Sequence, residues 1–168
     1  MHTHAVFRAM RALRGLGCAV LRFNFRGVGK SAGVIGDGEG ELTDGRTAFA
    51  ALAALQPGLP LLAGGFSFGS WVGLTVGAER GASALLGLGT PYGRYDFTPA
   101  KQAAVPKAFV LAARDEFTPA DTLERAVSTM RAPAQLWVVP GTSHLFTEDL
   151  DGYESRVAAA GQWILEKL

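Results

Sequence analysis

Segments with helical periodicity alternate with short apolar runs along almost the whole chain, and this alternation constrains the fold more than any other feature. The apolar runs predict strands at 18–25, 61–66, 84–89, 107–113 and 135–139. The periodic segments predict helices at 3–14, 42–55, 69–79, 119–130 and 148–168. Because the two kinds of segment alternate, we expect an α/β fold, a three-layer α/β/α sandwich around a mostly parallel sheet.

Three of the connections between these elements have a clear sequence signal. The segment 26–40 holds six glycines and is predicted to be a loop, 56–60 is predicted to be a turn, and 90–105 is predicted to be a long loop. A length of 168 residues suits a single domain. In a parallel sheet of this kind, functional residues gather where the strands end at their carboxyl side.

Charge and cysteine content narrow the function classes. The formal net charge of +1 gives no reason to expect a nucleic acid or an anionic membrane surface as partner. The single cysteine, Cys18, cannot form an internal disulfide and cannot build a zinc site. We expect a cytoplasmic protein, since no h-region with a cleavage site is visible, and the sequence implies no metal or organic cofactor.

The stretch 47–78 has 32 residues without a formal charge, which raises the question of a membrane span. The turn at 56–60 and the pair Gly64-Gly65 interrupt this stretch. It is better explained as a helix end, a buried strand and a buried helix. Gly69, Gly73 and Gly77 stand four apart on that helix, and we expect them to pack closely on the sheet and not on a second membrane helix.

The pattern Gly-x-Ser-x-Gly occurs twice, around Ser31 and around Ser67. This pattern places a nucleophilic serine only where a strand turns sharply into a helix, so that the positions two before and two after the serine must be small. Ser67 has an apolar strand directly before it and a helix directly after it. Ser31 lies within a glycine-rich loop, so Ser67 is the predicted nucleophile.

The segment 26–31 also resembles the end of a phosphate-binding P-loop. The full motif has a glycine five residues before its last glycine, and Asn24 occupies that position. A nucleotide site at this loop is therefore a weak third alternative.

A nucleophilic serine needs a base, and the base needs an acid that orients it. His144 is the only histidine after Ser67, and it lies in a loop that follows the strand 135–139. Asp115 follows the strand 107–113 by two residues and is the preferred acid, with Glu116 and Asp96 as alternatives. The backbone N–H of Phe68 is the first expected donor to an oxyanion.

Four motifs in one order resemble the α/β-hydrolase superfamily, namely 21–31, the serine elbow 64–69, the acid turn 113–119 and the histidine loop 141–146. The first of them resembles a signature of a small bacterial branch without a cap domain, which is related to dienelactone hydrolase but has serine as its nucleophile. The resemblance covers nearly the whole chain. It implies a serine hydrolase acting on a carboxylic ester, with Ser67, His144 and Asp115 as its triad.

The chain departs from this family at its N-terminal side. The family begins with further strands and a loop that supplies the second oxyanion donor, whereas this sequence begins with the helix that would follow that loop. One of the absent strands would lie between 18–25 and 61–66. We therefore expect residues 1–168 to form one α/β-hydrolase domain without these strands, and to be a poor enzyme as it stands.

The expected partner is a small acyl or ester substrate, and the sequence is also compatible with a homo-oligomer. Four aromatic residues are candidates for an apolar substrate pocket, although a place in the core suits them equally: Phe66, Tyr92, Phe97 and Phe146. The alternative to an enzyme is a non-catalytic relative that serves as a scaffold or binds a partner protein.

Overall fold

A parallel sheet forms the centre of the fold in a computed structural model that describes residues 3–131 and 133–168. Its strands lie in the order β1-β2-β3-β4, and every neighbouring pair is parallel. The strand bounds are β1 Leu62–Phe66, β2 Ala84–Leu88, β3 Lys107–Ala112 and β4 Ala134–Val139. The parallel direction places the carboxyl ends of all four strands along one edge of the sheet.

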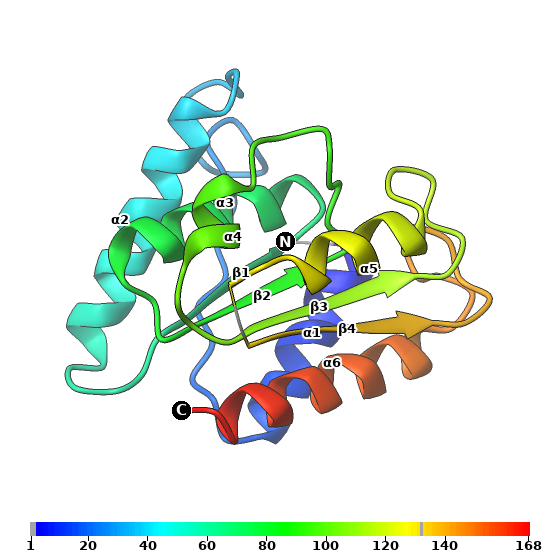
Figure 1. The fold of residues 1–168 in the computed structure, drawn as a ribbon. Coiled ribbons are helices and arrows are strands. Elements are labelled where there is room, and N and C mark those ends of the chain that lie inside the picture. The colour runs from blue at the N-terminus through cyan, green and yellow to red at the C-terminus, as the bar shows by residue number, and fades with distance from the viewer. Residues whose placement is uncertain (1–2, 132) are drawn as a thin grey trace.

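Helices cover both faces of this sheet, so the predicted three-layer α/β/α architecture is confirmed (Figure 1). On one face lie α1 and α6, and on the other lie α3, α4 and α5, with α2 packed outside α3. The helix bounds are α1 His4–Gly15, α2 Glu39–Leu55, α3 Phe68–Arg80, α4 Thr98–Gln102, α5 Ala120–Ser128 and α6 Leu150–Leu165. The expectation of an unbroken loop over 90–105 is wrong because α4 lies within it.

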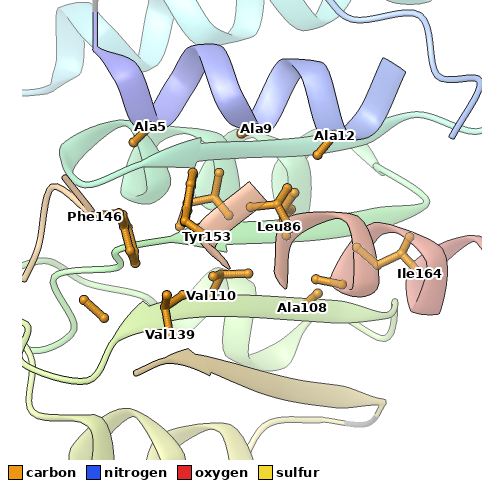
Figure 2. Close-up of a cluster of buried hydrophobic side chains, with 14 of the residues drawn as sticks. Ala5, Ala9, Ala12, Leu86, Ala108, Val110, Val139, Phe146, Tyr153 and Ile164 are labelled. Carbon is orange, nitrogen blue, oxygen red and sulfur yellow. The ribbon is translucent and has the colours of Figure 1, made fainter. Parts of the chain in front are cut away.

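A hydrophobic core lies on each side of the sheet. Figure 2 shows the core beneath α1 and α6, where Ala5, Ala9 and Ala12 of α1 lie close to the sheet. Tyr153 and Ile164 of α6 are fully buried in the same cluster. The small α1 residues allow this helix to approach its neighbours closely. A second cluster on the opposite face joins α3, α4 and α5 to the sheet.

The glycines of α3 bring this helix against β1. A Cβ atom added at Gly73 would lie 2.5 Å from the carbonyl oxygen of Gly64, and one added at Gly77 would lie 2.6 Å from the Cβ of Ala63. Real Cβ atoms do not approach other atoms so closely. Gly73 and Gly77 therefore pack on the sheet as expected, whereas a Cβ added at Gly69 would meet only Phe25, at 3.9 Å. None of the helices described over 3–131 and 133–168 is long and apolar enough to span a bilayer.

The prediction of a strand at 18–25 is wrong. This segment forms no strand in the structure, and β1 forms the edge of the sheet beside it. Cavities of about 450 Å³ and about 400 Å³ each touch both β1 and the segment, the first on the side of α1 and α6 and the second on the side of α2 and α3. A strand exists only where a neighbour accepts its hydrogen bonds, and here the gap separates the two segments.

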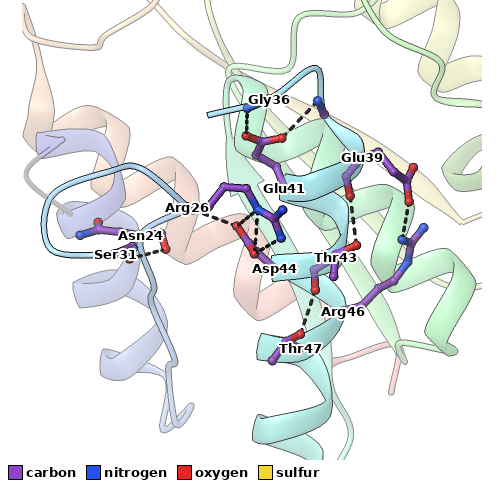
Figure 3. Close-up of polar contacts among 11 residues, drawn as sticks. Asn24, Arg26, Ser31, Gly36, Glu39, Glu41, Thr43, Asp44, Arg46 and Thr47 are labelled. Carbon is purple, nitrogen blue, oxygen red and sulfur yellow. Dashed lines mark hydrogen bonds and ion pairs between the residues drawn. The ribbon is translucent and has the colours of Figure 1, made fainter. Parts of the chain in front are cut away.

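The glycine-rich loop after this segment is held by α2 (Figure 3). Arg26 donates from its guanidinium to both carboxylate oxygens of Asp44. Glu41 is buried and accepts hydrogen bonds from the N–H groups of Gly36 and Gly38 at 2.8 and 3.1 Å. The Gly36 N–H holds the pKa of Glu41 below its ordinary value, because this hydrogen bond favours the ionised carboxylate.

Candidate active site

Ser67 occupies the single residue between β1 and α3, in a strained backbone conformation. Its φ is 54°, a value that residues other than glycine rarely adopt. Such strain persists only where the surrounding structure imposes it, and it is common at functional sites. A Cβ added at Gly65 would lie 2.0 Å from the Gly69 carbonyl oxygen, whereas one added at Gly69 would find only Phe25 at 3.9 Å. The expected need for a small residue therefore applies to Gly65 and not to Gly69.

His144 contacts both Ser67 and Asp115 from the loop that follows β4. Its Nε2 lies 2.8 Å from Ser67 Oγ, and its Nδ1 lies 2.8 Å from Asp115 Oδ2. With a proton on Nδ1, the ring donates to Asp115 and accepts from the serine hydroxyl. The imidazole and the carboxylate are almost fully buried, so water does not compete for these hydrogen bonds.

Asp115 is held in place by the turn that follows β3. Its Oδ1 accepts the N–H groups of Phe117 and Thr118 at 2.9 and 3.1 Å, which leaves Oδ2 facing the imidazole. The Thr118 hydroxyl donates to the Thr90 carbonyl at 3.0 Å and ties this turn to the end of β2. The structure thus brings Asp115 to His144 by way of a fixed turn.

The two alternative acids take other partners. Asp96 accepts the Thr98 N–H at 2.8 Å, and the hydrogen bonds from Thr98 keep the pKa of Asp96 below its ordinary value. Glu116 accepts the backbone N–H of His144 at 2.9 Å and leaves the imidazole nitrogens to Asp115 and Ser67. Neither carboxylate takes the place of Asp115 on the ring.

Aromatic rings enclose the imidazole on two sides. The ring centroids of Phe66 and Phe117 lie 5.1 and 4.5 Å from that of His144, and the Phe117 pair is T-shaped. Gly89, at the end of β2, leaves the space that the ring fills, since an added Cβ would lie 3.2 Å from its Cε1 atom. The ring is therefore confined by packing as well as by hydrogen bonds.

Ser67 opens into the cavity of about 400 Å³, whose volume suits a small organic ligand. Among the predicted pocket residues, Phe66 lines this cavity. Phe97 and Phe146 are buried in core clusters, and Tyr92 stacks on Phe97, so these three occupy the core positions that their sequence context also allowed.

The backbone N–H of Phe68 is the first of α3, so it has no acceptor within its own helix. The amino-terminal end of a helix carries a partial positive charge and stabilises a neighbouring anion. The predicted oxyanion donor therefore lies directly after Ser67, at the amino-terminal end of α3, where the partial positive charge stabilises an oxyanion.

Ser31 takes no part in this arrangement. Its hydroxyl donates to the backbone carbonyl of Asn24 at 3.1 Å. The helix after this loop begins at Glu39, well beyond the serine, whereas in a P-loop the helix follows the motif at once. The geometry favours neither a nucleophile nor a nucleotide site at Ser31. Over the described residues 3–131 and 133–168, no group of three or more His, Cys, Asp and Glu side chains could hold a metal ion.

The sequence indicated neither the role of Gly89 nor that of Thr118. Both depend on residues that are distant in the chain, since Gly89 faces His144 and Thr118 bonds to the Thr90 carbonyl. A glycine at the carboxyl end of a predicted strand, where site residues gather, is the one signal that could have identified Gly89.

Comparisons with known proteins place the chain among hydrolases of this architecture. A lidless α/β serine hydrolase of Xanthomonas campestris is 33% identical, with a TM-score of 0.88, and the match covers 98% of this chain and 75% of that one. An α/β serine hydrolase homologue of Coxiella burnetii is 28% identical, with a TM-score of 0.88 and coverage of 95% and 76%.

An uncharacterised protein of Rickettsia prowazekii is 30% identical over 159 residues, which cover 87% of this chain and 66% of that protein. The chain thus spans just under two thirds of this curated relative and about three quarters of the two solved structures. No protein-family model matches the sequence.

Proposed function

This chain belongs to the α/β serine hydrolases, and we propose from this premise that it hydrolyses carboxylic esters through an acyl-enzyme on Ser67. The observation that carries the proposal is the continuous line of hydrogen bonds from Ser67 Oγ through the His144 ring to Asp115, with 2.8 Å at each step. A serine, a base and an orienting acid within hydrogen-bond reach are the parts that nucleophilic acyl transfer needs.

In the first half of the proposed reaction, Ser67 Oγ attacks the acyl carbonyl while His144 Nε2 takes the hydroxyl proton. Asp115 holds the Nδ1–H tautomer and stabilises the positive charge that forms on the ring. The carbonyl oxygen becomes an oxyanion, and the Phe68 N–H donates to it. When this intermediate collapses, the ester C–O bond breaks and the imidazolium returns its proton to the departing alkoxide, which leaves as an alcohol.

In the second half, His144 takes a proton from water, and the resulting hydroxide attacks the acyl carbon of the ester formed with Ser67. The bond between the acyl carbon and Ser67 Oγ then breaks, and the imidazolium returns the proton to the serine oxygen. The products are a carboxylic acid and the free enzyme. The apolar lining of the cavity beside Ser67, which includes Phe25 and Phe66, favours an uncharged acyl or alcohol group.

One observation favours the alternative of a non-catalytic relative. Among the residues that the structure describes, none forms a strand on the outer side of β1, and unpaired strand edges attract other chains. A scaffold or partner-bound protein would use this edge and would not need Ser67 to react.

A fluorophosphonate probe separates the two functions, because it reacts with activated serines. We expect the probe to label the wild-type chain at Ser67, as located by mass spectrometry of the labelled peptide. Ser67→Ala should abolish labelling, and the matched variant Ser31→Ala should retain it. A folded wild-type chain that is not labelled, or is labelled at Ser31, would contradict the proposed hydrolase.

A further inference from the structure

Two adjacent carboxylates form hydrogen bonds with different parts of His144. Asp115 bonds to the imidazole of His144, and Glu116 accepts the backbone N–H of the same residue at 2.9 Å. We propose that Glu116 is a positioning residue, whose carboxylate fixes the main chain of His144 so that its ring reaches Ser67 and Asp115 together. This inference rests on the proposed function, since it assigns a role within the same site.

The geometry of the ring makes the position of the backbone important. Nε2 and Nδ1 must each lie 2.8 Å from an oxygen on a different element, Ser67 after β1 and Asp115 after β3. An imidazole swings about two side-chain torsions, so a displacement of its Cα atom moves both nitrogens. Hydrogen bonds to the ring alone leave the Cα atom free to move. A further hydrogen bond to the backbone N–H fixes both ends of the side chain.

The loop that carries His144 is fastened to the acid turn before the histidine is reached. The Arg114 N–H donates to the Thr142 carbonyl at 2.9 Å, and the Arg114 guanidinium donates to the Gly141 carbonyl. Glu116 continues this series of contacts to His144 itself. Two contacts from Arg114 and one from Glu116 thus hold the loop from Gly141 to His144.

The loop also contains a strained residue two positions after the histidine. Phe146 has a φ of 58°, in the left-handed region that side chains other than glycine rarely adopt. Its ring is fully buried against Tyr153, which holds that conformation from the core side. A strained segment keeps its shape only when its surroundings impose it. Glu116 holds the backbone of the same loop two residues earlier, at the N–H of His144.

A charged acceptor suits this task. Hydrogen bonds to a carboxylate are roughly twice as strong as those between neutral groups. A glutamine at this position keeps an acceptor oxygen on a side chain of the same length, and an alanine removes it. The two variants therefore separate loss of the contact from loss of the charge.

The experiment compares Glu116→Ala, Glu116→Gln and the control Glu124→Ala, which alters an exposed glutamate on α5. The substrate is para-nitrophenyl acetate, and circular dichroism establishes that each variant is folded. A misplacement of about 1 Å costs about 10²-fold in rate, so we expect Glu116→Ala to lower kcat by about 10- to 100-fold, with KM within about twofold. Glu116→Gln should recover most of this loss, and Glu124→Ala should behave as wild type.

A second measurement does not depend on turnover. The proton between His144 Nδ1 and Asp115 gives a downfield NMR resonance, which we expect in wild type and in Glu116→Gln, and which should shift or broaden in folded Glu116→Ala. If wild type fails to turn over the ester, the proposed function fails, and this resonance still tests the positioning role. Unchanged kcat and an unchanged resonance in folded Glu116→Ala would overturn the inference, as would equal losses in the alanine and glutamine variants.

Discussion

The three side chains of the Ser67–His144–Asp115 line are each fixed by a different kind of force. Backbone strain presents Ser67, with φ 54°. Two backbone N–H groups orient Asp115, and the rings of Phe66 and Phe117 confine His144. Because these constraints are independent, the hydrogen bonds along the line do not have to create the geometry that they use.

Removing the charge of Asp115 tests how much the rate of ester hydrolysis depends on this carboxylate. Asp115→Asn keeps the shape of the side chain but presents an amide to the ring and favours the wrong tautomer of His144. We expect kcat for para-nitrophenyl acetate to fall by about 10⁴-fold, the scale found for this change in serine proteases. Asp96→Asn, at the alternative acid, should leave kcat unchanged. A large loss in Asp96→Asn and none in Asp115→Asn would reverse our assignment of the acid.

The three residues of the Ser67–His144–Asp115 line could be predicted because each lies near the end of a predicted strand. Ser67, Asp115 and His144 each follow an apolar run, and the carboxyl ends of parallel strands share one edge of the sheet. The contact of Glu116 with the His144 backbone could not be predicted in this way. It depends on how two loops 28 residues apart lie in space, which no local pattern records.

At the scale of elements, the turn from β1 into α3 depends on one glycine more than on the other. A Cβ at position 65 would meet a backbone oxygen at 2.0 Å, so the strand or the helix would have to move. We expect Gly65→Ala to destabilise the fold by about 1–3 kcal/mol and to slow labelling of Ser67, as measured by urea unfolding and the fluorophosphonate probe.

The matched variant Gly69→Ala should change the unfolding free energy by less than about 1 kcal/mol, because the new methyl group has room and alanine favours the helix. Equal destabilisation by the two variants would show that the turn is not constrained as described.

The loop between 26 and 38 depends on the ionised carboxylate of Glu41 (Figure 3). Its pKa is lowered in the folded chain, so its contribution to stability is present above the unfolded value of about 4.3 and is lost as the pH falls through the folded value. We expect Glu41→Gln to be less stable than wild type at pH 7, with a difference that shrinks as the pH falls below about 4.

Urea unfolding across this pH range measures that difference. The control Glu39→Gln alters an exposed carboxylate on the same helix, and it should stay close to wild type throughout. A difference between wild type and Glu41→Gln that stays constant from neutral to acid pH would contradict the role given to the ionised carboxylate.

Most elements could be predicted from periodicity, and the exceptions have physical causes. The segment 18–25 has the composition of a strand but is not paired with a neighbouring strand. The short helix α4 has five residues, too few to show a period, and begins with Thr98-Pro99. Strand propensity describes a residue, whereas a strand requires a partner, so sequence reasoning failed where the partner is missing.

At the scale of the whole molecule, the edge of the sheet that carries the candidate site is closely packed, whereas the flank beside β1 is hollow. The carboxyl ends of β1, β3 and β4 meet at the Ser67–His144–Asp115 line, in which each hydrogen bond is 2.8 Å long. The outer side of β1 instead faces two cavities, and Leu21 and Phe23 beside them are 42% and 40% exposed. The unpaired flank therefore has not displaced Ser67 from His144.

The most direct test of the whole account is to trap the acyl group. The chain is mixed with para-nitrophenyl acetate, quenched in acid and digested, and the peptides are analysed by mass spectrometry. We predict one acetyl group on Ser67, absent in Ser67→Ala and retained in Ser31→Ala. Ester turnover that continues in Ser67→Ala, or an acetyl group found only on another residue, would contradict it.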